Sequence, residues 1–364
     1  MRPLDYITIK GFKSIKDLDR FKLNQLNVLI GANGSGKSNF IKVFTLLNNL
    51  VEGKLQEFVG REGGADNILF FGQKHTEELG IKLEFGINAY ECILIPDKAD
   101  KLIFKDEICY IHDKKQYKRP YDIKIGHGHN ESRLSEVSKR ARIAKYVYDD
   151  LKDWIVYHYH FHDTSTDAKV RLTCDINDNK FLRPDASNLA AFLYFHKKRH
   201  PTNYKNIVDT IKLVAPFFED FMLEPDRLNT EKIRLEWKHM ASDKYFNAST
   251  LSDGTLRFIC LATLFLQKRP PRTIFLDEPE LGLHPYAINI LSEMMKSVLK
   301  KTQIIVSTQS VTFVNQFDLE DVVVVDLDNE ESKFKRLTTN DMKEWLDEYG
   351  LGDLWEKNLL GGRP

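Results

Sequence analysis

A glycine-rich octapeptide near the start of the chain has the residue types and spacing of a phosphate-binding loop. Residues 31–38, Gly-Ala-Asn-Gly-Ser-Gly-Lys-Ser, fit the pattern G-x-x-x-x-G-K-[ST]. Glycines allow backbone N–H groups to converge on phosphate oxygens, and the start of a following helix adds positive potential. Lys37 would reach the β- and γ-phosphates of ATP, and the Ser38 hydroxyl would bind Mg²⁺.

Two adjacent acidic residues end an apolar run in the second half of the chain. The run at residues 273–276 is typical of a buried strand, and Asp277 and Glu278 follow it directly. Asp277 would hold Mg²⁺ directly or through water, and Glu278 would orient and polarise the attacking water. Because an independent phosphate loop is present, a catalytic pair explains these acids better than two solvent-exposed carboxylates do.

The segments around these residues alternate between strand and helix patterns. After the loop, Phe40, Phe44, Leu47 and Val51 recur at helical spacing and form one apolar face. The alternation predicts an α/β fold at both ends of the chain. The strands expected there are residues 6–10, 26–30, 273–276, 303–306 and 322–325, and the later helices are 255–267 and 286–300.

The middle of the chain has a different pattern of apolar residues. Short β-like runs between about 65 and 125 predict an antiparallel, strand-rich lobe. Residues 186–224 are expected to be helical and residues 231–238 to form a strand. The β-like runs are residues 68–71, 81–85, 90–95 and 101–104.

Three further blocks complete a family pattern. They are Ile9–Ser14 (Ile-Lys-Gly-Phe-Lys-Ser), Leu251–Gly254 (Leu-Ser-Asp-Gly) and Thr308–Ser310 (Thr-Gln-Ser). Together with the loop and Leu276–Glu280 (Leu-Asp-Glu-Pro-Glu), they make the chain resemble the ABC-type ATPase heads shared by SMC, RecF and overcoming-lysogenization-defect (OLD) proteins. The resemblance is strongest to compact bacterial ATPases of phage-defence operons. It implies an ABC-ATPase head, a P-loop NTPase fold, split by a strand-rich and helical insertion.

The resemblance also implies a division of the chain into three segments. Residues 1–60 would be the N-terminal part of the ATPase lobe with the phosphate loop. Residues 61–240 would be the insertion or second lobe, including a basic segment. Residues 241–364 would be the C-terminal part of the lobe, with the signature, the acidic strand, the switch and an acidic tail.

The family pattern carries roles onto individual residues. The signature residues Ser252, Asp253 and Gly254 would contact the γ-phosphate of an ATP held by an opposing protomer, so that a head-to-head homodimer encloses two ATPs. A plain helix cap at Ser252 is the alternative. Lys13 resembles the basic residue near the adenine and phosphates, although an exposed lysine is equally ordinary. The residues expected to bind ATP in the loop are Asn33, Gly34, Ser35, Gly36, Lys37, Ser38 and Asn39.

One position departs from the family. The switch position usually carries His, whereas this chain has Gln309. Glutamine can accept a hydrogen bond from water or donate one to a γ-phosphate, but it cannot take a proton. We therefore expect slow hydrolysis, with ATP acting mainly as a clamp of the dimer. His284, which follows the acids, could face the partner subunit.

The glutamine that contacts Mg²⁺ in the family has two candidate locations here. Gln73 follows a strand-like run, but the segment 157–163 matches better by position. In that segment His158, His160 and His162 share one face of a strand. With Asp163 they could bind zinc, but we favour a polar face that lines the nucleotide cleft.

Composition limits the class of protein. Lys plus Arg and Asp plus Glu both number 53, so net charge indicates no particular partner. Four widely spaced cysteines argue against a zinc hook or a disulfide scaffold. The start has no apolar signal core and no apolar run approaches 18 residues, so we expect a cytoplasmic protein with no membrane partner.

Charge is distributed unevenly along the chain. Residues 101–146 contain twelve basic and six acidic residues, and residues 315–364 contain six and thirteen. The basic segment 114–146 could contact DNA or RNA, or it could be a solvated loop. The C-terminal residues 351–364 carry apolar side chains that would either dock on their own domain, which we favour, or bind a partner.

These patterns favour one function over two others. No heptad run is long enough for a coiled coil, and because only 54 residues follow Ser310 we expect no Toprim nuclease domain of the kind that OLD proteins carry. We therefore expect an ATPase that serves as the sensor or switch of an antiphage defence system, with a separately encoded effector. A RecF-like DNA-repair ATPase that clamps on DNA is the alternative, and an ATP-binding scaffold with almost no turnover is the third.

Overall fold

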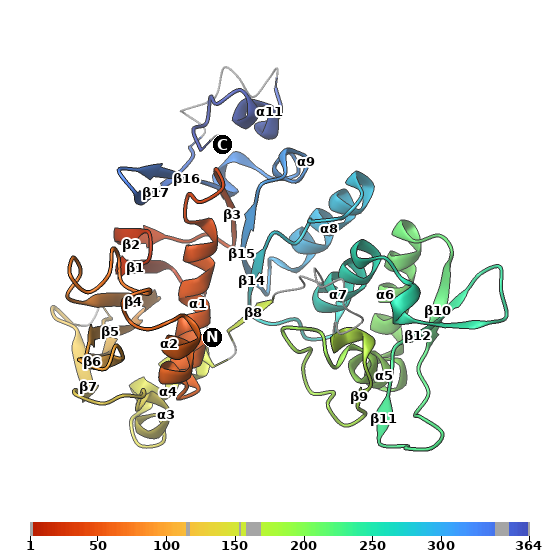
Figure 1. Cartoon of the computed structure of the whole chain (residues 1–364), viewed down its shortest axis with the longest axis horizontal. Helices are drawn as coiled ribbons and strands as arrows, with labels where there is room; N and C mark the ends of the chain where they lie inside the picture. Colours follow the sequence, from red (N-terminus) through yellow and green to blue (C-terminus); the bar gives the residue numbers. More distant parts are fainter. Residues whose placement is uncertain (1–2, 114–116, 153, 158–168, 339–348, 363–364) are drawn as a thin grey trace. The chain divides into compact units, whose positions relative to one another are not determined.

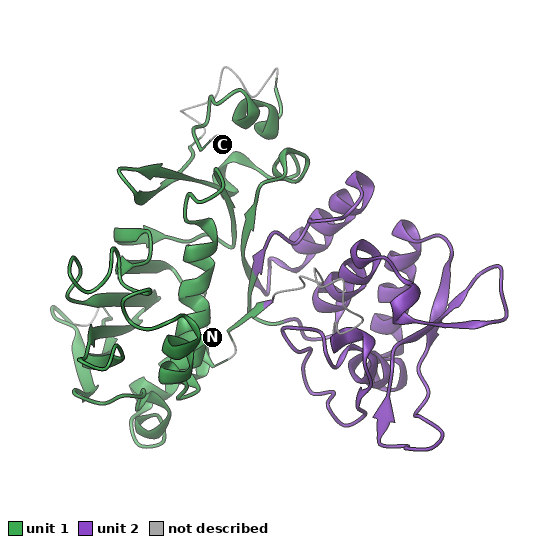
Figure 2. Cartoon of the chain, viewed as in Figure 1, with its two compact units in different colours: residues 1–156, 271–275, 303–364 green, residues 157–270, 276–302 purple. Residues whose placement is uncertain are grey.

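The computed structural model describes residues 3–113, 117–152, 154–157, 169–338 and 349–362 (Figure 1). The chain forms two compact units (Figure 2). Unit 1 comprises residues 1–156, 271–275 and 303–364, and unit 2 comprises residues 157–270 and 276–302. Each unit contains residues from more than one of the three consecutive segments expected from the sequence.

A six-stranded sheet, the central sheet, contains strands from both the N-terminal and the C-terminal part of the chain. Its strand order is β17-β16-β3-β15-β14-β8. Every residue of β3 and β15 is buried, as expected for parallel strands with both faces covered. The strands predicted at 26–30, 273–276, 303–306 and 322–325 are confirmed. The strands are β3 (Leu26–Ile30), β8 (Ile155–Tyr157), β14 (Thr273–Asp277), β15 (Gln303–Thr308), β16 (Val322–Asp328) and β17 (Glu331–Arg336).

A second six-stranded sheet in unit 1 is antiparallel throughout, in the order β2-β1-β4-β5-β6-β7. It confirms the strand-rich lobe predicted from the runs at 81–85, 90–95 and 101–104. The sequence patterns missed β2, because its outer face is charged and only Ile15 and Leu18 are buried. The strands are β1 (Tyr6–Phe12), β2 (Ile15–Lys22), β4 (Leu79–Phe85), β5 (Asn88–Pro96), β6 (Leu102–Ile111) and β7 (Tyr121–Gly126).

The strand predicted at residues 68–71 is wrong. These residues lie in turns, and Leu69 makes only an isolated bridge to Phe12. Phe71 and Gly72 have φ angles of 53° and 78°, in the left-handed region that ends an extended run. This apolar tetrapeptide therefore forms turns rather than a strand.

The helix after the phosphate loop, α1 (Lys37–Val51), packs its predicted apolar face into the core of unit 1. Phe40 lies against Phe334 of β17, with 5.3 Å between ring centroids. Phe44 stacks on Phe275 of β14 at 4.0 Å. The helix is thereby fixed against the sheet whose strands carry the site. The other α-helices among the described residues of unit 1 are α2 (Leu55–Arg61), α3 (Leu134–Val137), α4 (Arg142–Leu151), α9 (Val311–Val314) and α11 (Leu351–Glu356).

Unit 2 combines helices with a three-stranded antiparallel sheet of order β10-β12-β13 and a small pair, β9 and β11. The helices predicted at 255–267 and 286–300 are confirmed as α7 and α8. The elements are β9 (Cys174–Asp175), α5 (Leu189–Arg199), α6 (Pro201–Val214), β10 (Phe218–Met222), β11 (Lys232–Ile233), β12 (Glu236–His239), β13 (Tyr245–Asn247), α7 (Asp253–Leu266) and α8 (Pro285–Val298).

Two predictions in unit 2 need correction. Residues 186–224 are not helical throughout, because α6 ends at Val214 and β10 follows. Pro216 disfavours helical conformation at the residue before it, and Phe218 is then buried against Trp237 in the sheet. The strand expected at 231–238 is divided into β11 and β12, which belong to different sheets.

The C-terminal segment docks on unit 1, as favoured from the sequence. Leu354 and Trp355 of α11 are 0% and 3% exposed, and the Gly352 N–H donates to Asn315 Oδ1 at 2.6 Å. Part of the acidic region is core rather than tail, because β16 and β17 form an antiparallel hairpin in the central sheet. No described helix has the length and apolarity required to cross a membrane.

Candidate functional site

The register of two parallel strands sets the position of the phosphate loop. Thr308, the last residue of β15, pairs with Ile30, the last residue of β3. Loops that follow parallel strands meet at the same edge of the sheet, which is where ligands bind in such folds. The structure thus brings Gln309 to the loop. A cavity of about 130 Å³ is lined by Asn33, Gly34, Gly36, Lys37, Ser38, Asn39 and Gln309.

The ammonium group of Lys37 is held by the backbone of its own loop. Its Nζ donates to the carbonyl oxygens of Gly31 and Ala32, each at 2.7 Å, and the residue is 4% exposed. Lys37 and Ser38 are the first residues of α1, so the positive end of that helix adds to the lysine charge. The loop therefore presents a cation, a hydroxyl and backbone donors to one small cavity.

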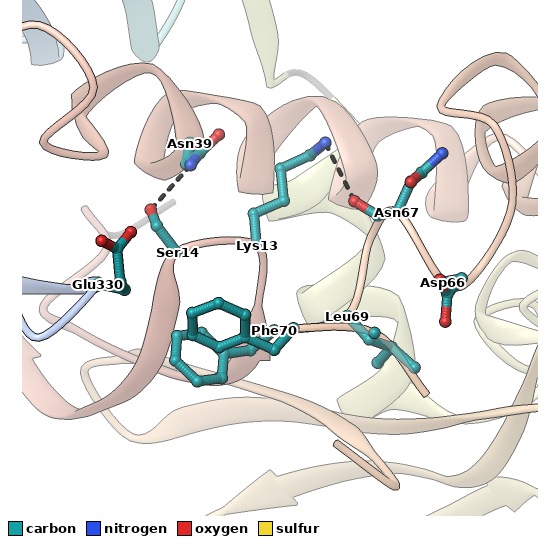
Figure 3. A pocket seen from close by; sticks show the side chains of 10 residues that line it. Lys13, Ser14, Asn39, Asp66, Asn67, Leu69, Phe70 and Glu330 are labelled. Carbon is teal, nitrogen blue, oxygen red and sulfur yellow. Dashed lines mark hydrogen bonds between the residues drawn. The ribbon is translucent and has the colours of Figure 1, made fainter. Parts of the chain in front are cut away.

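A larger cavity of about 620 Å³ lies in unit 1 and shares Asn39 with the first (Figure 3). Asn39 Nδ2 donates to Ser14 Oγ at 2.8 Å in its wall. Phe71 is 57% exposed, so an aromatic face is available to a ligand. The wall combines this face with amides and carboxylates. It is formed by Lys13, Ser14, Asn39, Asp66, Asn67, Leu69, Phe70, Phe71, Gly72 and Glu330.

Lys13 lies at the wall of this larger cavity in an ion pair. Its Nζ is 2.8 Å from Glu62 Oε2, which also pairs with Lys42 at 3.1 Å. Burial opposes ionisation of Glu62, but hydrogen bonds from Lys13 and Lys42 outweigh it and lower the pKa of that carboxyl. The predicted ATP-binding lysine is thus oriented by a charged partner that the sequence patterns did not reveal.

The signature residues lie at the start of α7 in unit 2. Ser252 caps the helix, since its Oγ accepts from the Thr255 N–H at 3.2 Å, and both Ser252 and Asp253 are exposed. Asp253 pairs with Arg171 at 2.5 Å. A β-carbon at Gly254 would lie 2.3 Å from the carbonyl oxygen of Gly282, so this position accepts only glycine. The helix start is therefore both capped and accessible.

The predicted acids end β14, which follows β15 in the order of the central sheet. Asp277 is the last residue of the strand, and Glu278 has a φ angle of 45°, in the left-handed region. A non-glycine residue held there is often found at functional sites. His284 caps α8 through Nδ1, which accepts from the Tyr286 N–H at 3.3 Å.

The structure describes only one of the two candidate locations for the glutamine that contacts Mg²⁺ in the family. Gln73 Nε2 donates to Asp100 Oδ1 at 2.5 Å, and Gln73 lines neither of the two cavities above. His158, His160, His162 and Asp163 lie outside the described residues. Among the residues that are described, no three His, Cys, Asp or Glu side chains gather as metal ligands.

The basic segment lies on β7, α3, α4 and the loops between them. Lys114 and Lys115 are outside the described residues. Two tyrosines of the segment, Tyr117 and Tyr121, are 63% and 65% exposed. The other basic side chains of the segment are all exposed: Lys118, Arg119, Lys124, Arg133, Lys139, Arg140, Arg142 and Lys145.

Comparison with known families assigns the chain to a group. Residues 26–315 match the family described as "AAA domain, putative AbiEii toxin, Type IV TA system". The chain belongs to this AAA-domain family. The match spans the phosphate loop, the signature, the acids and Gln309. No curated protein matches the chain significantly.

Solved structures show which ATPase fold this AAA-domain protein has. It is 18% identical to an SMC head bound to the C-terminal winged-helix domain of ScpA, with a TM-score of 0.58 over 94% of this chain and 99% of that one. It is 15% identical to an SMC head with an extended coiled coil, bound to the C-terminal domain of ScpA from Pyrococcus furiosus, with a TM-score of 0.53 over 96% and 99%. The α/β P-loop fold and the resemblance to ABC-type ATPases of the SMC and RecF group are confirmed.

Proposed function

We propose that this AAA-domain protein binds ATP with Mg²⁺ and hydrolyses it slowly, as a head-to-head homodimer that encloses two nucleotides. The observation that carries the proposal is the cavity in which the phosphate loop, Lys37, Ser38 and Gln309 meet. Backbone donors and a lysine cation are groups that bind a triphosphate. The larger cavity, which shares Asn39, suits the ribose and the base.

The residues present fit MgATP. The hydroxyl of Ser38 and the carboxylate of Asp277 are hard oxygen donors of the kind that Mg²⁺ prefers. When bound, the ion neutralises charge on the phosphates. Glu278 polarises the attacking water, and Gln309 orients that water or donates to the γ-phosphate. Because Gln309, unlike the histidine usual at the switch position, cannot take a proton, we expect slow hydrolysis.

Dimerisation follows from the signature. Ser252 and Asp253 are exposed and Gly254 is half-buried at the start of α7, which has 14 residues. An exposed helix N-terminus attracts an anion, and a γ-phosphate presented by a second copy of the chain is the anion that the family resemblance implies. In each site Lys13, Asn33, Gly34, Ser35, Gly36 and Asn39 complete the binding of the nucleotide from its own protomer.

The biological role that we propose is that of a sensor or switch subunit in a cytoplasmic antiphage defence system, acting on a separately encoded effector. The family description, which names AbiEii and a type IV toxin–antitoxin system, supports this setting. A RecF-like DNA-repair ATPase is the second candidate. The exposed basic side chains with interleaved tyrosines favour it, because such surfaces bind nucleic acid.

Two substitutions test ATP binding and hydrolysis separately. Lys37→Ala removes the charge that meets the β- and γ-phosphates and should abolish ATP binding. Glu278→Gln removes the group that polarises water and should preserve binding while stopping turnover. Calorimetric titration with ATP and phosphate release measure the two effects. Undiminished turnover in Glu278→Gln would overturn the assignment of Glu278.

A further inference from the structure

A side chain from the opposite end of the chain reaches the phosphate loop. Ser332, on β17, is 1% exposed. Its Oγ donates to the carbonyl oxygen of Ser35 at 2.6 Å and lies 2.7 Å from Ser14 Oγ. Its backbone N–H donates to the carbonyl oxygen of Ser14 at 2.8 Å. The hairpin of β16 and β17 is thus bonded to the loop and to the residue after Lys13.

These bonds form a continuous chain of hydrogen-bonded groups. Asn39 Nδ2 donates to Ser14 Oγ at 2.8 Å, as drawn in Figure 3. Ser332 has one hydroxyl hydrogen, and the Ser35 carbonyl can only accept it. The Ser332 hydroxyl also points at Ser14 Oγ, so its single hydrogen is shared between the Ser35 carbonyl oxygen and Ser14 Oγ. The chain runs from Asn39, which lines both cavities, through Ser14 and Ser332 to the backbone of the loop.

The hairpin also packs closely against two glycines of the loop. A β-carbon at Gly36, where φ is 107°, would lie 2.0 Å from Ser332 Oγ. A β-carbon at Gly31 would lie 2.1 Å from the carbonyl oxygen of Val325. The loop therefore has little room to move toward the hairpin at either of these glycines.

We propose that Ser332 is a positioning residue for the phosphate loop. In a trans peptide the C=O and N–H groups point in opposite directions. The bond from Ser332 to the Ser35 carbonyl consequently turns the Gly36 N–H away from the hairpin, toward the side on which phosphate binds. The chain through Ser14 links that orientation to Asn39. This inference rests on the proposed binding of ATP and adds a residue that no phosphate-loop pattern contains.

The test compares Ser332→Ala with Ser138→Ala. Ser138 is a matched control in the same unit, because it is 8% exposed and its Oγ donates to the Ser135 carbonyl at 2.7 Å, away from both cavities. We expect Ser332→Ala to raise the Kd for MgATP roughly five- to tenfold, as the loss of one hydrogen bond implies. Ser138→Ala should stay within about twofold of wild type while lowering the unfolding midpoint comparably.

Two more variants sharpen the result. Ser14→Ala combined with Ser332→Ala should weaken binding no more than the stronger single substitution, because both interrupt one chain. Ser332→Cys, whose thiol is a weak donor, should also weaken MgATP binding, and it replaces Ser332→Ala if the alanine variant does not fold.

The outcomes separate this inference from the proposed function. Wild-type affinity in both Ser332 variants overturns the role of Ser332 and leaves ATP binding intact. Equal weakening in Ser332→Ala and Ser138→Ala assigns the effect to stability and also overturns it. A wild-type chain that does not bind MgATP overturns the proposed function, and the positioning role with it.

Discussion

The loop lysine makes two strong hydrogen bonds to the backbone of its own loop. Lys37 donates to the carbonyls of Gly31 and Ala32. A phosphate oxygen that approaches this ammonium competes with those carbonyls, so the net gain is smaller than that of an isolated charge. In return, the lysine needs little reorganisation to meet its ligand. Both the competition and the small reorganisation result from the positions of the Gly31 and Ala32 carbonyl groups.

Phe71 offers a residue-scale test of the larger cavity. Its ring packs against Phe70, with 4.6 Å between centroids, yet stays 57% exposed, and its φ of 53° is of the kind found at functional sites. Phe71→Ala should raise the Kd for ATP several-fold, because stacking on a base is lost, and should change the unfolding midpoint little. Phe71→Trp, which keeps an aromatic face, should bind nearly as wild type. Equal affinity in all three proteins would show that the base does not contact Phe71.

At the scale of elements, hydrogen bonds from one arginine of β17 connect segments of the central sheet that are far apart in the sequence. Arg336 of β17 donates to the carbonyl of Glu320 at 2.8 Å and to Asn27 Oδ1 at 2.5 Å. Asp321 lies half-buried beside this junction. Burial, and then repulsion from Asp318, raise the pKa of Asp321 to about 6, although the charge of Arg336 opposes the shift.

The raised pKa of Asp321 predicts a pH-dependent cost to stability. The folded state binds this proton more tightly than the unfolded state, so stability falls as pH rises from about 4 to 6 and stays lower above that range. Asp321→Asn should therefore raise the free energy of unfolding by about 1–2 kcal/mol at pH 8 and hardly at all at pH 4. Urea titrations at both pH values measure this, with the exposed Asp19→Asn as control. A gain of equal size at both pH values would contradict the prediction.

At the scale of the whole molecule, the proposed active unit is larger than one chain. The exposed signature belongs to one compact unit and the phosphate loop to the other. A symmetric homodimer, in which each chain contributes its loop to one site and its signature to the second, uses both surfaces twice.

Mixing two inactive variants tests this arrangement. Lys37→Ala and Ser252→Arg chains should each lack ATPase activity alone. A heterodimer of the two should regain at most one composite site, because one of its two sites combines an intact loop with an intact signature. Phosphate release from defined mixtures measures the recovery. Full activity of Ser252→Arg by itself would reduce the signature to a helix cap.

The basic surface tests the alternative function. Lys118→Glu, Arg119→Glu and Lys124→Glu together should weaken binding to duplex DNA or RNA and reduce its salt dependence, since each phosphate contact contributes about 0.9 to the slope on duplex DNA. ATP affinity should not change. Three exposed basic residues of unit 2 serve as the charge-matched control: Lys205, Arg227 and Lys244. If wild type shows no salt-dependent binding with or without ATP, the RecF-like role is excluded.

Local sequence patterns determined much of the fold and the chemistry. The phosphate loop, the acids at the end of β14 and the cap at Ser252 each occupy a few consecutive positions, and buried parallel strands appear as continuous apolar runs. Such features are set by nearest neighbours along the chain, so they can be predicted without knowing the fold. The same local rules failed at residues 68–71, where left-handed φ angles at Phe71 and Gly72 ended the run.

Only the tertiary structure decided which distant residues meet. Gln309 reaches the loop because β15 pairs with β3 in one register. Lys13 is oriented by Glu62 of the turn after α2. Ser332 touches Ser14 although 318 positions separate them in the chain. These contacts depend on strand order and register between segments far apart, and a one-residue change of register would turn every side chain of a strand to the other face.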